Sequence, residues 1–420
     1  RFIVGEANGR YLSNGIIQEK YLAGRLKEYL SSIFEFRNGD LKPYKFLLKH
    51  DIYDWILHEV EERTLAQLLI TFNEVYFEAL DEDILGEVYE HYLEEDRDED
   101  TGKSYRRMLG QYYTPRPIVR LMWLLVRDVL KRRDGRDLYV KDANLLKIVD
   151  PFMGSGTFLN EAILQMKMSD SAKGVVRGEV FHFFKDRGEQ RRIENSINGF
   201  EINPLSCSIA DINLYFRLIR SFDKIALERT PIQELNLFRT DSFSLSKGAA
   251  CSQDPLQMVL FASDVRGSIG ENSRINNAKS GKYNIIVSNP PYGEITPNTT
   301  LQEEFIPFAY AKNNFDPSGS IIPFDWDKGR PIGRVPNDEK NRGKIKDMFG
   351  FAFGVADRLL CPNGIVCFIV SNTLLSVPSY KWLRKYLLDN YSIEYLINFN
   401  KTAERSNSMF EPEAAIATCI

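Results

Sequence analysis

The chain has few of the residues from which metal sites and cross-linked folds are built. Its 420 residues include five cysteines and four histidines, and no two cysteines form a Cys-x-x-Cys pair. This scarcity argues against a structural zinc site and favours reduced thiols in a cytoplasm. Long hydrophobic runs are also lacking: none approaches the roughly 20 residues that a membrane-spanning helix needs, and no secretory signal is recognisable. We therefore expect a cytoplasmic protein without metal or membrane.

A basic excess is lacking too. Lysine and arginine number 54 against 58 acidic residues, which gives a net charge of −4, whereas proteins that bind nucleic acid usually carry a positive charge. Much of the acidity is local, in the run Glu94–Asp100, and the rest of the chain is about neutral. The composition therefore permits a basic cleft but does not indicate one.

Two regions of different pattern divide the chain. From about residue 13 to 93, apolar residues recur at three- and four-residue spacing, which predicts helices. Beyond the acidic run, short apolar strands alternate with helical stretches, which predicts a mainly parallel sheet with helices on both faces. We expect a small all-helical connector domain over 1–105 and an α/β domain over 106–420. Polar stretches interrupt the second domain as expected insertions or loops at about 169–195, 243–280 and 296–346.

The clearest local signal is the stretch Ser288-Asn289-Pro290-Pro291-Tyr292. It follows Tyr283–Val287, an apolar run that is typical of a buried strand. Two consecutive prolines cannot continue a sheet, so the strand must end at Asn289 and the chain must turn. An amide, a fixed carbonyl and an aromatic ring then lie at the carboxyl end of a strand, where open α/β sheets bind ligands. Taken alone, the tetrapeptide also fits an ordinary turn.

A strand, a glycine turn and a helix follow one another over residues 145–163. The strand ends at Asp150 and continues into Pro151-Phe152-Met153-Gly154-Ser155-Gly156-Thr157. This order opens nucleotide-binding folds. Gly154 and Gly156 permit backbone conformations and a close ligand approach that a Cβ atom would block.

Two further strands are followed by acids. The strand over 197–203 contains Glu201, whose carboxylate can accept hydrogen bonds from both hydroxyl groups of a ribose. The strand over 236–242 contains Asp241, which is placed to accept a hydrogen bond from an adenine amine. Upstream, Thr114 is expected to cap a helix that has Pro115 in its first turn, and such a helix end also binds carboxylates. Downstream, helices are expected over 349–360 and 379–390, and strands over 365–370 and 393–399.

From about Gly110 onward, the order of these motifs resembles that of the DNA adenine-N6 methyltransferases of bacterial restriction-modification systems. It is most similar to the large fused restriction-methylation (type IIG-like) enzymes, and Leu85–Glu90 resembles their helical lead-in. The resemblance implies a class I, Rossmann-like fold with a doubly wound, mainly parallel, seven-stranded sheet. It also implies a target-recognition domain beyond residue 420 and allows an N-terminal nuclease in the parent chain.

The resemblance also implies roles for individual residues. The cofactor would be S-adenosylmethionine, with its methionine part near Thr114 and Asp150–Gly156, its ribose on Glu201 and its adenine on Asp241. The expected cofactor-binding residues are Tyr113, Thr114, Pro115, Asp150, Pro151, Gly154, Ser155, Gly156, Thr157, Glu201, Ile202, Asp241 and Asn289. The expected catalytic residues are Asn289, Pro290, Pro291, Tyr292 and Phe410, and no metal is expected.

The implied reaction methylates the exocyclic N6 amine of an adenine that is flipped out of double-stranded DNA. This amine is a poor nucleophile because its lone pair is conjugated into the ring. If the side-chain oxygen of Asn289 and the carbonyl oxygen of Pro290 accept both amine protons, the lone pair becomes available. Stacking on Tyr292 and Phe410 would offset the cost of extruding the base, at about 1–3 kcal/mol per stacked ring.

Several alternatives stay open. RNA guanine-N2 methyltransferases share both motifs, and protein-glutamine methyltransferases share the tetrapeptide. A non-catalytic, cofactor-binding or DNA-holding subunit would keep the fold without methyl transfer. Methylation of the cytosine amine is chemically possible at the same site, whereas methylation of cytosine C5 is excluded because it usually needs a Pro-Cys thiolate and no Pro-Cys occurs. No nuclease site is recognisable, so we expect no DNA cleavage by this chain.

Overall fold

The computed structural model describes residues 20–28, 60–74, 86, 114–138, 146–170, 187–219, 235–243, 269–292, 324–325, 330–331, 347–377, 380–399 and 418–419. The chain divides into two compact units. The first comprises Arg1–Ile84, Val180–Gln190 and Tyr215–Glu234, and the second comprises Leu85–Glu179, Arg191–Leu214 and Leu235–Ile420. No helix within the described ranges is long and apolar enough to cross a bilayer.

The first unit contains the helix α4 (Glu62–Glu74). Leu65 and Leu69, four positions apart, are each 6% exposed, while Leu68 is 47% exposed. At the start of α4, Glu62 Oε1 accepts hydrogen bonds from the backbone amides of Leu26 (2.8 Å) and Lys27 (3.3 Å). This carboxylate ties the start of the helix to an upstream segment. Most of the expected helical domain lies outside the described residues.

The second unit is built on five parallel strands. These are β1 (Ile148–Asp150), β2 (Ile197–Glu201), β3 (Asn236–Arg239), β4 (Tyr283–Ser288) and β7 (Leu360–Phe368), in the order β3-β2-β1-β4-β7. β1 lies in the middle, where Ile148 is opposite Ile197 of β2 and opposite Ile285 of β4. All three side chains are buried, as expected for a parallel sheet that is covered on both faces. The parallel sheet that the sequence predicts is thereby confirmed.

The chain changes its direction across the sheet at β1. From β1 it passes to β2 and β3 on one side, and it then returns to β4 and β7 on the other side. Ligands of doubly wound sheets bind outside the carboxyl ends of the strands at such a switch point. Here those strand ends are Asp150 of β1 and Ser288 of β4.

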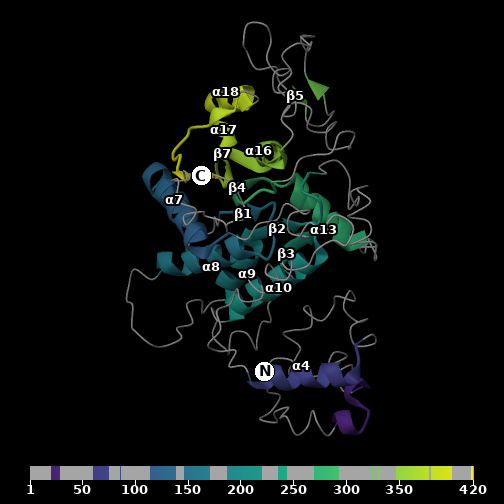
Figure 1. The fold of residues 1–420 in the computed structure, drawn as a ribbon. Coiled ribbons are helices and arrows are strands. Elements are labelled where there is room, and N and C mark those ends of the chain that lie inside the picture. Colours follow the sequence, from purple (N-terminus) through teal and green to yellow (C-terminus); the bar gives the residue numbers. More distant parts are fainter. Residues whose placement is uncertain are drawn as a thin grey trace. The chain divides into compact units, whose positions relative to one another are not determined.

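Two helices cover one side of the sheet (Figure 1). α8 (Thr157–Asp170) packs on β1 and β2, and α7 (Arg116–Asp134) packs on α8 and β7. The indole Nε1 of Trp123 in α7 donates a 2.9 Å hydrogen bond to the carbonyl oxygen of Phe158 in α8. Arg127 of α7 forms two 2.8 Å bonds with the carboxylate of Asp137 and a third, of 2.9 Å, with Gln165 of α8. These contacts along α7 fix the whole helix on α8, and they thereby fix the position of its first turn.

A second group of helices shares an apolar cluster with the strands. α13 (Ile269–Ser280), α16 (Met348–Leu359) and α18 (Lys381–Asn390) contribute buried side chains to it. Val149 of β1 and Ile286 of β4 belong to the same cluster. Because neighbouring residues of a strand face opposite sides, Ile148 and Asp150 face away from this cluster. In Figure 1 the sheet lies between α7 and α8 on one side and α13 on the other.

Some expectations about the elements are not met. Among the described residues the parallel sheet has five strands, not seven, and β9 (Asn398–Phe399) and β10 (Thr418–Cys419) form an antiparallel sheet with β8 (Val370–Ser371). The strand expected over 393–399 begins only at Asn398. Its apolar residues do not enter the core, since Ile393 is 50% and Leu396 57% exposed.

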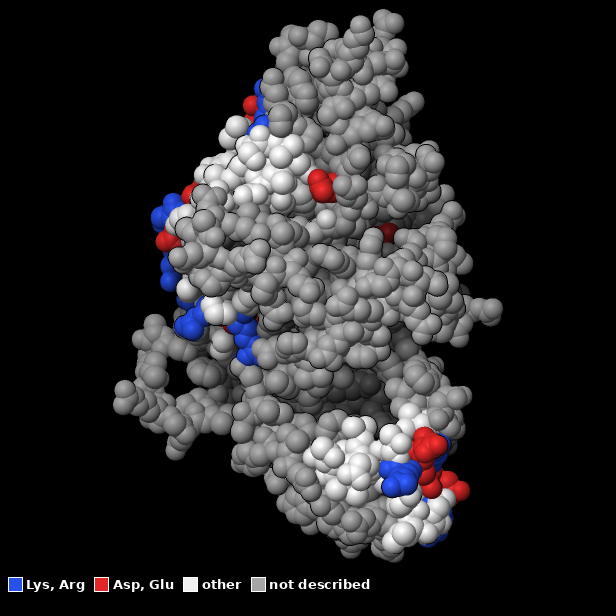
Figure 2. All heavy atoms as spheres, in the orientation of Figure 1, with Lys and Arg blue, Asp and Glu red and all other residues white. Residues whose placement is uncertain are grey.

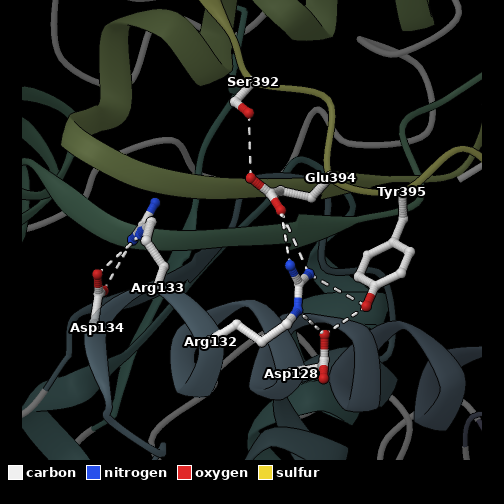
Figure 3. A network of polar contacts seen from close by, with 7 residues as sticks. All are labelled: Asp128, Arg132, Arg133, Asp134, Ser392, Glu394 and Tyr395. Atoms are coloured by element: carbon white, nitrogen blue, oxygen red, sulfur yellow. Dashed lines mark hydrogen bonds and ion pairs between the residues drawn. The ribbon is translucent and has the colours of Figure 1, made fainter.

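Polar contacts hold residues 391–397 against α7 instead (Figure 3). The guanidinium of Arg132 donates to Asp128 (2.6 Å) and to Glu394 (3.4 Å), and it lies 5.5 Å from the ring centre of Tyr395. The hydroxyl group of Tyr395 donates to Asp128, and this bond, together with Arg132, lowers the pKa of the Asp128 carboxyl. The nearby Lys131 and Arg133 are paired with Asp137 and Asp134. Charges of both signs therefore mix at the left margin of Figure 2, where α7 lies.

Three expected insertions contain regular structure. α9 (Arg187–Ser196) fills the end of the stretch over 169–195, and its Ile193 is buried. α13 lies within the expected loop over 243–280, where Ile275 is the one buried apolar side chain among residues 273–280 and gives too weak a pattern to predict a helix. A short antiparallel pair, β5 (Phe324–Asp325) and β6 (Arg330–Pro331), lies in the stretch over 296–346. Two further helices are α10 (Pro204–Ile219) and α17 (Thr373–Ser376).

Candidate active site

The turn that follows β4 is attached to the strands on both sides of it. Ser288 Oγ donates a 2.6 Å hydrogen bond to Asp150 Oδ1 at the end of β1. The carbonyl oxygen of Ser288 accepts from the amide of Ile369, just beyond β7 (3.1 Å), and the hydroxyl group of Tyr292 donates to the carbonyl oxygen of Ile369 (3.2 Å). Pro290 is buried and Pro291 half-buried between these points. The turn therefore has a defined position at the switch point of the sheet.

The side chain of Asn289 reaches the start of α7. Its Nδ2 atom donates a 3.1 Å hydrogen bond to Oγ1 of Thr114, which is 4% exposed. The expectation that Thr114 caps α7 is wrong, because the residue at the cap is Pro115 and the helix start has no side-chain capping bond from it. The amides of Ile118 and Val119 instead bond to the carbonyl oxygen of Pro115, so the helix begins without the hydroxyl group.

Asp150 is a fully buried carboxyl group. Oδ1 accepts hydrogen bonds from Ser288 and from the amide of Phe152 (3.0 Å), while no described residue donates to the buried Oδ2 atom. Loss of hydration raises the pKa of Asp150 to about 7, the two hydrogen bonds oppose that rise, and the charge of Glu201 adds to it. A cationic group beside Oδ2 would favour the ionised form.

The two glycines of the turn after β1 have different surroundings. Both have positive φ angles, 53° at Gly154 and 84° at Gly156, which a residue with a side chain rarely adopts. A Cβ atom on Gly156 would lie 2.8 Å from Leu214 Cδ1 and 3.0 Å from Ala210 Cβ of α10, whereas one on Gly154 would meet no atom of the described residues within 4 Å. Gly156 thus allows α10 to pack closely, and Gly154 borders open space.

Glu201 connects this turn to the start of α10. It is 4% exposed, and Oε2 accepts from the amide of Gly154 (2.9 Å) while Oε1 accepts from the amide of Asn203 (2.7 Å). Asn203 Oδ1 in turn accepts from the amides of Leu205 (2.9 Å) and Ser206 (3.3 Å) in the first turn of α10. Glu201 thus has a structural role that the sequence did not predict. The sequence signal for this contact was Asn203 directly before Pro204, because an Asn followed by a Pro is typical of a capped helix start.

The end of β3 joins the same region. Asp241 Oδ1 accepts from the amide of Phe243 (2.9 Å) in a local turn. The hydroxyl group of Ser242 donates to the carbonyl oxygen of Pro151, and the rings of Phe152 and Phe243 lie 5.1 Å apart. The loops after β1, β2 and β3 are therefore linked at the carboxyl edge of the sheet.

The structure brings most of the expected site residues to this one edge. These are Thr114, Pro115, Asp150, Pro151, Gly154, Ser155, Gly156, Thr157, Glu201, Ile202, Asp241, Asn289, Pro290, Pro291 and Tyr292. Tyr113 and Phe410 lie outside the described residues. The sequence assigned no role to Ser288, although a polar residue at the end of an apolar strand was a usable signal. No group of three potential metal ligands occurs within the described ranges.

A cavity of about 350 Å³ lies at the other end of the sheet. It is lined by Leu130, Arg133, Asp134, Arg136, Leu146, Asn284, Pro362 and Asn363. These residues belong to the end of α7 and to the starts of β1, β4 and β7, far along the strands from Asp150 and Ser288. The cavity is therefore separate from the candidate active site.

Sequence comparisons match most of the second unit to methylases. A sequence model described as N-6 DNA Methylase matches residues 80–319, more than half of the chain. A second model, described as Eco57I restriction-modification methylase, matches residues 334–404.

Solved structures with a similar fold come from restriction-modification enzymes. The ATP-dependent Type ISP enzyme LlaBIII bound to DNA has a TM-score of 0.58 at 17% identity, over 96% of this chain and 25% of that chain. A DrdV–DNA complex has a TM-score of 0.52 at 17% identity, over 96% of this chain and 33% of that chain. A nuclease-deletion mutant of the Type ISP enzyme LlaGI with a DNA substrate mimic has a TM-score of 0.56 at 16% identity, over 96% of this chain and 30% of that chain. The present chain thus spans a quarter to a third of the length of these proteins, and the likeness shows the shared fold.

Proposed function

The chain belongs to the N-6 DNA methylase family, and on this basis we propose that it transfers a methyl group from S-adenosylmethionine to the N6 amine of adenine in double-stranded DNA, as the modification part of a restriction-modification system. The observation that carries the proposal is the position of Asn289. It lies at the switch point of a parallel sheet, where its side chain bonds to Thr114 and the preceding residue, Ser288, bonds to the buried acid Asp150. This is where such folds bind their ligands.

Two features of the site fit the proposed cofactor. The buried Oδ2 atom of Asp150 would gain from a cationic group, and the methionine part of S-adenosylmethionine carries an ammonium group. The open space at Gly154 lets a ligand approach the backbone. We assign the ribose to Glu201 and the adenine to Asp241, with the other expected residues around them. When bound, the cofactor supplies a methyl group on a sulfonium, which makes that carbon electrophilic.

The residues of the turn would prepare the target amine. The oxygen atoms of the Asn289 side chain and of the Pro290 backbone would each accept one hydrogen bond from the amine, which favours a pyramidal nitrogen whose lone pair is available to attack. The ring of Tyr292, whose hydroxyl group is attached to Ile369, stacks on the flipped base, and Phe410 is proposed to do the same. Holding both reactants in line supplies much of the rate, because a bimolecular step becomes effectively unimolecular.

Three larger features belong to the same proposal. The sheet would have seven strands if β8 continues β7, so that β10 and β9 extend it in the order β7-β10-β9. The helical connector would occupy 1–105 and the catalytic domain 106–420. A target-recognition domain would belong to the parent protein, and the proposal allows, without requiring, a nuclease there. The length of the structural relatives, three to four times that of this chain, is consistent with further domains.

The first test is cofactor binding measured by isothermal titration calorimetry. We expect the protein to bind S-adenosylmethionine, Asp150→Ala to lose the binding, and Asp389→Ala to keep it. Asp389 is a matched control because it lies on the exposed side of α18, paired with Lys385. Absence of binding by the folded wild-type chain would contradict the proposal.

The second test identifies the product. The full-length protein is incubated with DNA and labelled cofactor, and the nucleosides are analysed by mass spectrometry. We expect N6-methyladenine. N4-methylcytosine would assign the site to the cytosine amine, and cofactor binding without any transfer would indicate a non-catalytic subunit. A parallel reaction contains RNA in place of DNA, and label in RNA alone would favour guanine-N2 methylation.

A further inference from the structure

The hydroxyl group of Thr114 faces the catalytic turn. Its Oγ1 atom accepts the 3.1 Å hydrogen bond from Asn289 Nδ2, and the residue is 4% exposed. The family resemblance gives Thr114 a role toward the cofactor, and its position before a helix gives it a capping role. The contact with Asn289 belongs to neither of these roles.

Two independent anchors determine where Asn289 lies. On one side, Ser288 is bonded to Asp150 of β1, which fixes the backbone next to Asn289. On the other side, Thr114 lies two residues before the start of α7 at Arg116, and α7 is held on α8 by the bond between Trp123 and Phe158. The acceptor for the Asn289 side chain therefore has a fixed position relative to the sheet.

The direction of the Asn289 amide matters for the reaction. Only its oxygen atom can accept a hydrogen bond from the target amine. If the NH₂ group pointed there instead, two hydrogen-bond donors would face each other. The terminal torsion of an asparagine is broad and roughly two-fold, so the side chain needs a partner to select one direction. A threonine hydroxyl group can donate or accept. In the structure Oγ1 of Thr114 accepts from Nδ2, and this bond points the other branch of the amide, Oδ1, away from Thr114.

We propose that Thr114 is a positioning residue that sets the direction of the Asn289 amide, so that Oδ1 faces the target amine. This inference rests on the methyl-transfer function proposed above, and it replaces the cofactor contact that the family resemblance assigns to Thr114 as far as the hydroxyl group is concerned. It predicts that loss of the Thr114 hydroxyl group slows methyl transfer while cofactor affinity is kept. A role in holding the cofactor predicts the reverse.

The test compares three variants of the full-length enzyme. Thr114→Val keeps the shape and removes the acceptor, Thr114→Ser keeps the hydroxyl group, and Thr240→Val is the matched control. Thr240 is 5% exposed, and its hydroxyl group has no hydrogen-bond partner among the described residues. The two readouts are kcat for DNA methylation at saturating substrates and the Kd of S-adenosylhomocysteine by calorimetry.

We expect Thr114→Val to lower kcat roughly ten- to a hundredfold, as small displacements of reacting groups do, and to leave Kd within threefold. Thr114→Ser should restore most of kcat, and Thr240→Val should keep it within twofold. The inference is overturned if Thr114→Val keeps kcat within twofold, if its Kd rises more than tenfold, or if Ser fails to restore kcat. A wild-type enzyme that transfers no methyl group would instead refute the proposed function, and this inference with it.

Discussion

The electrostatics of the site centre on the carboxyl group of Asp150. Burial removes its hydration and raises its pKa to about 7, and the hydrogen bonds from Ser288 and the Phe152 amide only partly offset this. The folded protein therefore binds a proton that the unfolded chain has already released at the same pH. Stability and ligand affinity both become functions of pH through this one residue.

The sign of the pH effect follows from the raised pKa. Between the ordinary pKa of an aspartate and about 7, the native state holds more protons than the unfolded state, so the contribution of Asp150 to stability falls as pH rises. From pH 5.5 to 8 the loss is about 2 kcal/mol, since one pKa unit corresponds to about 1.4 kcal/mol. The test measures the free energy of unfolding of wild type and Asp150→Asn with urea at pH 5.5 and at pH 8. We expect the stability of wild type relative to Asp150→Asn to fall by this amount between the two pH values. A pH-independent difference between the two proteins would contradict it.

Substitution of Asn289 should separate catalysis from binding. Asn289→Ala removes the oxygen that accepts a hydrogen bond from the amine, so we expect kcat to fall at least about a hundredfold, as for loss of other preorganised hydrogen bonds in a transition state, while the Kd of S-adenosylhomocysteine changes little. Asn284→Ala is the control: it lies on the same strand, β4, but at the end away from the site, where it bonds to Lys147. It should leave kcat unchanged. A large loss of ligand affinity in Asn289→Ala would show that its role is misassigned.

At the scale of elements, the turn after β1 contains two glycines that are required for different reasons, a positive φ angle at both and close packing at Gly156 alone. Gly154→Ala places a side chain at positive φ in open space, at a cost of about 1–2 kcal/mol. Gly156→Ala has the same backbone problem and also meets Leu214 and Ala210, which should add about 1–3 kcal/mol. Urea unfolding of both variants measures the difference. Equal losses would mean that the packing of α10 does not require Gly156.

The sequence predicted the elements better than the contacts between them. The central strands β1 and β4 could be predicted because each is an apolar run that ends at or near a polar residue or a proline, as at Asp150 and Pro290. The bonds between Asp150 and Ser288 and between Thr114 and Asn289 join residues 138 and 175 positions apart, and no local rule pairs them. Local capping preference assigned Thr114 to α7, and a tertiary contact took its hydroxyl group instead.

The segment over 393–399 shows the opposite kind of error. Its apolar residues have the pattern of a strand, but neighbouring Glu394 and Tyr395 bind to Arg132 and Asp128 on the exposed side of α7 (Figure 3). The apolar side chains of Ile393 and Leu396 therefore stay at the surface. Periodicity alone does not distinguish a buried strand from an exposed segment that polar contacts hold.

At the scale of the whole molecule, the described site residues belong to the second of the two compact units. Ligand binding should therefore protect that unit selectively. In hydrogen-exchange mass spectrometry, we expect S-adenosylhomocysteine to slow exchange in peptides that cover 150–157 and 288–292, and to leave α4 unchanged. Asp150→Ala with the same ligand is the control and should show no protection. Equal protection of α4 would contradict a site confined to the second unit.

The strand order also determines when the site can form during synthesis on a ribosome. Asn198 of β2 bonds to β1 across 50 residues, whereas Ser288 follows Asp150 by 138 residues. At about 5–20 residues per second, Ser288 is made roughly 7–28 s after Asp150. Strands β1 to β3 can pair during that time, with Asp150 hydrated and ionised at the edge of a half-formed sheet. The arrival of β4 then dehydrates the carboxyl group and favours its protonation, so the nascent protein completes its reaction centre in the same step that completes the middle of its sheet.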